Sequence, residues 1–142
     1  MAFNVLIVDD SSSMRSVIKK TLKVSGFNVG QFLMAGDGKE ALMVLADEWV
    51  DLVLTDINMP NMNGMELLTE MKKDEMLKTI PVVMITTEGS EKIMQESIKL
   101  GAQGYVKKPF RPEEIKKILN SIMGEKESGQ RKIDDEFESS DF

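Results

Sequence analysis

Three aspartates in this sequence stand where apolar runs end. Asp9 and Asp10 follow the run Val5–Val8, and Asp56 closes the run that begins at Leu52. An apolar run followed by turn residues is typical of a buried strand that enters a loop. The carboxyl ends of strands in open α/β sheets are where ligands bind. An acid can also end a strand and simply be hydrated, so a site requires other groups to converge on Asp56.

Two further polar groups follow strand-like runs. Thr86 ends the run that begins at Val82, and Lys108 follows Gly104–Lys107. All strands of a doubly wound parallel sheet end at the same edge, and in the strand order 2-1-3-4-5 the first and third strands are neighbours. This order predicts three carboxylates, one hydroxyl and one ammonium group at a single edge.

Clustered carboxylates of this kind need a counter-charge. At ~4 Å and an effective dielectric constant of 20, each pair repels by about 4 kcal/mol. Protonation of one acid or binding of a cation relieves that repulsion. Because the available ligands are all oxygens, the pattern favours a hard cation such as Mg²⁺. A hydrated acidic edge with no ion is the alternative.

Composition removes several other chemistries. The chain has 142 residues and contains neither Cys nor His, which excludes thiol catalysis, disulfides and a phosphohistidine on this chain. The net charge is -6, and residues 124–142 account for most of it with seven acids against three bases. Neither part has the basic excess of a nucleic-acid-binding protein. Since no signal peptide or membrane-length apolar run is present, we expect a cytoplasmic protein that does not associate with membranes.

Strands and helices alternate along the predicted fold. Apolar runs predict strands at 5–8, 27–35, 52–56, 82–86 and 104–107, and helical spacing predicts helices at 11–25, 39–49, 65–71, 90–100 and 112–122. The apolar face of the first helix is expected to include Val17, and that of the fourth helix Ile98. Five such units predict an α/β, flavodoxin-like fold: a doubly wound five-stranded parallel sheet of order 2-1-3-4-5 with five helices.

The chain divides at about residue 123. Residues 1–123 carry all of the periodic segments and form one predicted domain, whereas 124–142 are acidic and lack apolar periodicity. Such composition favours a disordered tail. A docking segment is the alternative, because Ile133, Phe137 and Phe142 place apolar side chains in the acidic stretch.

Four segments carry a family resemblance, and they occur in order over residues 5–123: VLIVDDSSSMR, DLVLTDINMPNMNGMEL, PVVMITTEG and GAQGYVKKPF. The sequence resembles a response-regulator receiver domain, and specifically the single-domain regulators of chemotaxis. The resemblance implies that Asp56 is the phosphoacceptor. It implies that Mg²⁺ is bound by Asp10, Asp56 and the backbone carbonyl of Asn58, with Asp9 acting through a metal-bound water.

The resemblance also implies an output switch. Lys108 and Thr86 would contact the phosphoryl group, and a cis peptide would precede Pro109. Tyr105 would turn inward as Thr86 moves, which would change the surface of the fourth helix, fifth strand and fifth helix. Asn58 and Glu88 would tune phosphate loss. The implied partners are a histidine kinase as phosphodonor, the flagellar motor switch and a phosphatase.

Three other functions compete with a phosphorylated switch. A phosphorelay intermediate or a phosphate sink would use the same site. An aspartyl-phosphate phosphatase of the haloacid dehalogenase type would need a second acid two residues after the nucleophile, where this chain has Asn58. The chain is therefore predicted not to be an enzyme. In a flavodoxin-type module, Asp9 and Asp10 would repel the phosphate of the flavin.

Overall fold

The computed structural model describes residues 2–87 and 89–124. Glu88 and the segment 125–142, with Ile133, Phe137 and Phe142, lie outside these residues. The strands are β1 (Phe3–Val8), β2 (Val29–Ala35), β3 (Leu52–Thr55), β4 (Val82–Thr86) and β5 (Gly104–Lys107). The helices are α1 (Ser12–Ser25), α2 (Gly38–Asp47), α3 (Gly64–Lys73), α4 (Glu91–Leu100) and α5 (Pro112–Leu119), and a π-helical turn, Asn120–Gly124, extends α5.

The five strands form one parallel sheet in the order β2-β1-β3-β4-β5. The predicted fold class and strand order are therefore confirmed. In β3 and β4 every residue is buried, as are the last four residues of β1. Continuous apolar strands of this kind belong in the centre of a parallel sheet, because helices cover both of its faces.

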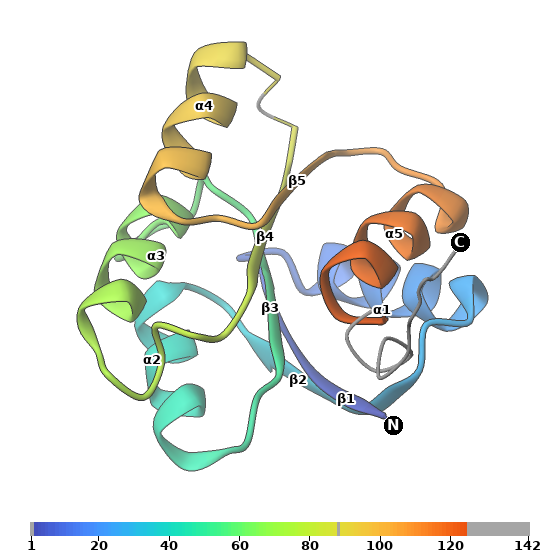
Figure 1. Cartoon of the computed structure of the whole chain (residues 1–142), viewed down its shortest axis with the longest axis horizontal. Coiled ribbons are helices and arrows are strands. Elements are labelled where there is room, and N and C mark those ends of the chain that lie inside the picture. Colours follow the sequence, from blue (N-terminus) through green and yellow to red (C-terminus); the bar gives the residue numbers. More distant parts are fainter. Residues whose placement is uncertain (1, 88, 125–142) are drawn as a thin grey trace, which may run out of the picture.

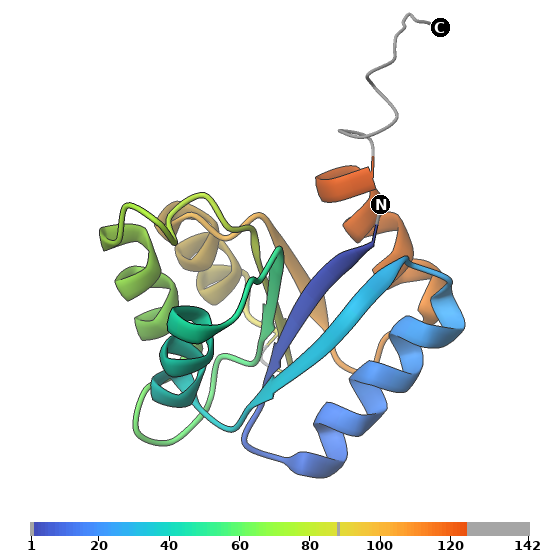
Figure 2. The ribbon, with the colours of Figure 1, turned by 90° about the horizontal axis from the view of Figure 1, so that it is seen from below.

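The helices form a layer on each side of the sheet (Figures 1 and 2). On one side α2 and α3 bury their apolar stripes, and α4 packs there through Ile93. On the other side lie α1 and α5. Alternate strand residues point to opposite layers, so Leu6 and Val8 join the first cluster while Val5 and Ile7 join the second.

Helix ends follow the capping signals of the sequence. Ser11 caps α1, and Gly26 ends it in the left-handed conformation with φ 82°. The predicted end of the second helix was wrong, because Glu48 is already extended and Trp49 lies beyond the helix, 77% exposed. The predicted apolar faces of two helices were also too wide, because Val17 and Ile98 are about half exposed.

The second strand begins two residues later than predicted. Phe27 is buried and stacks on Phe3, with ring centroids 5.5 Å apart, but it lies outside β2. The register between β1 and β2 shifts at this point, since Phe3 pairs with Val29 and Asn4 with Gln31. Gly30 is therefore the extra residue of a bulge, which accounts for the interrupted apolar pattern.

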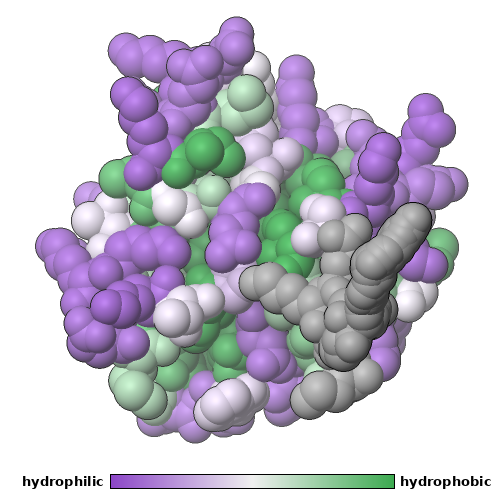
Figure 3. All heavy atoms as spheres, in the orientation of Figure 1, coloured by the Kyte–Doolittle hydropathy of each residue, from purple (hydrophilic) through white to green (hydrophobic). Residues whose placement is uncertain are grey.

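No helix within the described ranges is long and apolar enough to cross a bilayer. Seen from the side drawn in Figure 1, the surface is mostly hydrophilic around its rim, and apolar atoms gather nearer the middle of that face (Figure 3).

Candidate functional site

Three carboxylates meet at the edge where the strands end. Val8 of β1 pairs with Thr55 of β3, and the Asp56 N–H donates to the Val8 carbonyl at 2.9 Å. This pairing brings the residues after the two strands together. One carboxylate oxygen from each of Asp9, Asp10 and Asp56 lies within 4.8 Å of the others. The structure thus assembles the acidic group that strand order predicted.

Lys108 supplies the counter-charge. Its Nζ lies 3.0 Å from Oδ2 of Asp9 and 3.4 Å from Oδ2 of Asp56. The side chains of Lys108, Asp9 and Asp56 are only 9%, 3% and 12% exposed, so these charges interact with little screening by water. Three carboxylates and one ammonium leave a formal charge of about -2, which matches a divalent cation.

The loop after β1 holds Asp9 in place. Its Oδ1 accepts a hydrogen bond from the Ser11 N–H at 2.9 Å, and the Arg15 guanidinium donates to its backbone carbonyl. Asp10 is exposed beside it. The sequence analysis placed no role on Arg15. A cation near the start of a helix interacts unfavourably with the helix dipole. The position of Arg15 near the start of α1 was therefore a signal that its guanidinium has another role, here the hydrogen bond to the Asp9 carbonyl.

The loop between β3 and α3, residues 56–63, is shaped by close backbone contacts. The Ile57 N–H donates to Oδ1 of Asp56 at 2.7 Å, and the Gly64 N–H donates to the Ile57 carbonyl at 2.9 Å. A Cβ atom on Gly64 would lie 2.2 Å from the Asp56 carbonyl oxygen. Only glycine fits there. Asn58 is exposed within this loop, so its side chain is open to solvent.

Thr86 and Tyr105 lie on adjacent strands. Thr86 ends β4 with no exposed surface, and its carbonyl accepts the Lys108 N–H at 2.8 Å. Tyr105 pairs with Met84, two residues before Thr86. Residues two apart on a strand share a face, so Tyr105 and Thr86 lie on the same side of the sheet. The cis peptide predicted before Pro109 is confirmed.

A contact between two loops, one before α2 and one before α3, was missed by the sequence analysis. Nδ2 of Asn61 donates to Oδ2 of Asp37 at 2.7 Å. That bond and the N–H of Glu40 hold the pKa of Asp37 below its usual range. Asn61 has φ 66°, a conformation in which Asn is enriched. In the sequence, the only sign of a role for Asp37 was its position just before a predicted helix, where Asp often acts as the N-cap.

The comparisons with known proteins agree with this geometry. The response regulator receiver domain family matches residues 5–120, and the chain belongs to this family. Chemotaxis protein CheY1 of Helicobacter pylori is 40% identical over 121 residues, which cover 84% of this chain and 96% of that protein. The crystal structure of CheY4 from Vibrio cholerae superposes with a TM-score of 0.77 at 36% identity, covering 87% of this chain and all of that one.

A third relative is a complex that contains BeF3 and Mg²⁺. It is the CheX–CheY–BeF3–Mg²⁺ complex of Borrelia burgdorferi, with a TM-score of 0.75 at 30% identity, covering 84% of this chain and 88% of that one. The chain is therefore a CheY-like receiver domain of two-component signalling. Receiver domains bind Mg²⁺ at an acidic pocket, and the cluster of Asp9, Asp10 and Asp56 offers such a pocket here.

Proposed function

We propose that this protein is a single-domain response regulator that a histidine kinase phosphorylates on Asp56 in a chemotaxis-type pathway. One observation carries the proposal: Lys108 bridges Asp9 and Asp56 within the three-carboxylate cluster. An acid that accepts a phosphoryl group needs a cation to balance the incoming oxygens. The ammonium of Lys108 already stands beside the acceptor oxygen.

The reaction forms an acyl phosphate. A carboxylate oxygen of Asp56 attacks phosphorus in line, the P–N bond of the donor phosphohistidine breaks, and the imidazole leaves. The donor is on another protein because this chain has no His. Lys108 then pairs with a phosphoryl oxygen, and the Thr86 hydroxyl donates to another. Attack of water on the acyl phosphate ends the signal, and Asn58 and Glu88 are proposed to tune the rate of this step.

The acidic cluster is the proposed Mg²⁺ site. Asp10, Asp56 and the carbonyl of Asn58 would hold the ion directly, and Asp9 would hold it through a water. When bound, Mg²⁺ supplies positive charge that offsets the charge on the phosphoryl oxygens. The oxygen donors and the excess negative charge of the cluster support this assignment.

Output is proposed to pass through Thr86 and Tyr105 to the face formed by α4, β5 and α5. Their position on one side of adjacent strands supports the coupling. A shift from 1:99 to 99:1 between two states needs ~5.5 kcal/mol, which new bonds from Lys108 and Thr86 and the metal contacts together can supply. The partner proposed for this face is the flagellar switch in the cytoplasm. A phosphatase and a protein similar to CheX, which is bound to CheY in the Borrelia burgdorferi complex, are further candidate partners.

A phosphorelay intermediate or phosphate sink is the second candidate, because it would use the same site without an output partner. Transfer from a labelled phosphohistidine tests both. With Mg²⁺, label from a chemotaxis histidine kinase should move to the wild type and not to Asp56→Asn. Failure of the wild type to take label would refute the proposed function. Passage of the label onward to a second histidine domain would favour the relay.

A further inference from the structure

We propose that Asp37 and Asn61 form a positioning pair that holds the β3–α3 loop in the shape needed for Mg²⁺ binding. Neither residue is proposed to touch the ion or the phosphoryl group. The pair would act by fixing the backbone that carries Asp56 and the Asn58 carbonyl. This inference rests on the proposed function of that site.

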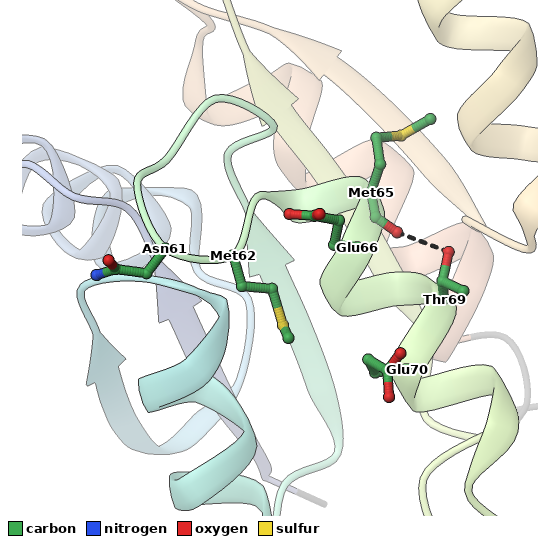
Figure 4. Close-up of a pocket in the computed structure, with 6 residues that line it drawn as sticks. All are labelled: Asn61, Met62, Met65, Glu66, Thr69 and Glu70. Atoms are coloured by element: carbon green, nitrogen blue, oxygen red, sulfur yellow. Dashed lines mark hydrogen bonds between the residues drawn. The ribbon is translucent and has the colours of Figure 1, made fainter.

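The pair joins two segments that are far apart in sequence. Asp37 is 8% exposed, and its two oxygens have different tasks. Oδ1 accepts the N–H of Glu40 at 2.8 Å and so caps α2, whereas Oδ2 accepts Nδ2 of Asn61 at 2.7 Å. In Figure 4 the Asn61 side chain points toward the segment that leads into α2 and away from Met62. A single carboxylate therefore ties the loop to a helix start.

The two backbones also touch beside this bond. The Gly38 N–H donates to the Met62 carbonyl at 3.0 Å. A Cβ atom on Gly38 would lie 2.6 Å from Cγ of Met62 and 2.9 Å from its carbonyl oxygen. A larger residue would push the loop away from α2. The contact consequently requires glycine next to the aspartate that makes the side-chain bond.

These contacts bracket the proposed metal ligand. On one side of Asn58, the Ile57 carbonyl is held by the Gly64 N–H at 2.9 Å. On the other side, Asn61 is tied to Asp37. Asn58 itself is exposed. Groups that orient metal ligands from outside commonly change metal affinity by about 10-fold or more when they are removed.

Two substitutions remove the pair and keep local structure. Asp37→Ser retains a good N-cap but has a single oxygen, so it cannot serve both partners. Asn61→Gly retains access to positive φ but loses the donor. The exchanged pair, Asp37→Asn together with Asn61→Asp, keeps a cap oxygen at position 37 and reverses the direction of the side-chain hydrogen bond, so it serves as the conservative variant. Leu45→Val, a buried position in the last turn of α2, is the control for reduced stability without a change at the loop.

Two quantities are measured on the full chain. The Mg²⁺ dissociation constant is obtained from the change in amide chemical shifts during a Mg²⁺ titration, and the hydrogen-exchange rate is measured for the Gly38 amide. Asp37→Ser and Asn61→Gly should bind Mg²⁺ about 10-fold more weakly and exchange the Gly38 amide faster. The exchanged pair, Asp37→Asn together with Asn61→Asp, should stay near wild type, and Leu45→Val should keep wild-type affinity. Equal affinity in all variants would overturn the positioning role alone, whereas a wild type that binds no Mg²⁺ would overturn the proposed metal site together with it.

Discussion

At the scale of residues, Lys108 is the group on which the resting site depends. Its ammonium lies between Asp9 and Asp56, and all three side chains are nearly buried. Removing one partner from such a cluster leaves uncompensated charge in a poorly hydrated place, which costs more than the intact pair contributes. In the proposed reaction the same ammonium changes partner, so one residue serves both stability and phosphorylation.

Lys108→Gln should therefore destabilise the protein without abolishing its fold. We expect the free energy of unfolding to fall by about 2 kcal/mol, less than for a fully buried pair because Asp10 is open to water. Urea unfolding with and without Mg²⁺ measures this, and Mg²⁺ should recover part of the loss. Lys107→Gln, an exposed neighbour of equal charge, is the control. Equal stability of the two variants would show that Lys108 does not balance the cluster.

At the scale of elements, the site is made by loops whose ends are held by backbone contacts. The β3–α3 loop closes through Gly64, where no side chain fits against the Asp56 carbonyl. The same residue is the first of α3, and Asn63 caps that helix: its Oδ1 accepts the Glu66 N–H, and its own N–H donates to Oε1 of Glu66. The start of α3 and the β3–α3 loop are thus one structural unit, and a substitution in either should change the position of Asp56.

Gly64→Ala tests this unit. The added Cβ would lie 2.2 Å from a backbone oxygen, which cannot move without displacing Asp56. We expect a loss of about 3 kcal/mol or more in the free energy of unfolding, measured by thermal or urea denaturation. At Gly36, the nearest atoms to an added Cβ belong to the Glu40 side chain, the closest at 3.3 Å. Gly36→Ala should cost much less, and a Gly64→Ala protein as stable as Gly36→Ala would contradict the argument.

At the scale of the whole molecule, the fold and most of the site could be predicted because periodicity and topology determine them. Apolar runs located the strands, and the strand order brought Asp9, Asp10 and Asp56 to one edge. Three features depend instead on packing between distant segments: the bulge at Gly30, the end of α2 before Trp49 and the exposure of Val17. Local patterns do not contain that information.

The contact between Asp37 and Asn61 escaped prediction for the same reason. Asp and Asn are both common in turns, so neither residue stands out in the sequence. Only the folded chain shows that the two turns contact each other. The division of the chain at residue 123 stays a prediction, as do the roles of Glu88 and of the segment 125–142. The roles of Thr86 and Tyr105 in output also remain predictions, although their placement on one side of the sheet is consistent with them.

The central claim is that Asp56 accepts a phosphoryl group in a Mg²⁺-dependent reaction, and the mass of the intact protein tests it most directly. Incubation with a small acyl phosphate and Mg²⁺ should add about 80 Da to the wild type. Asp56→Asn should show no gain, because an amide cannot form the acyl phosphate. A wild-type mass that does not change, or a phosphoryl group that maps to another residue, would contradict the account.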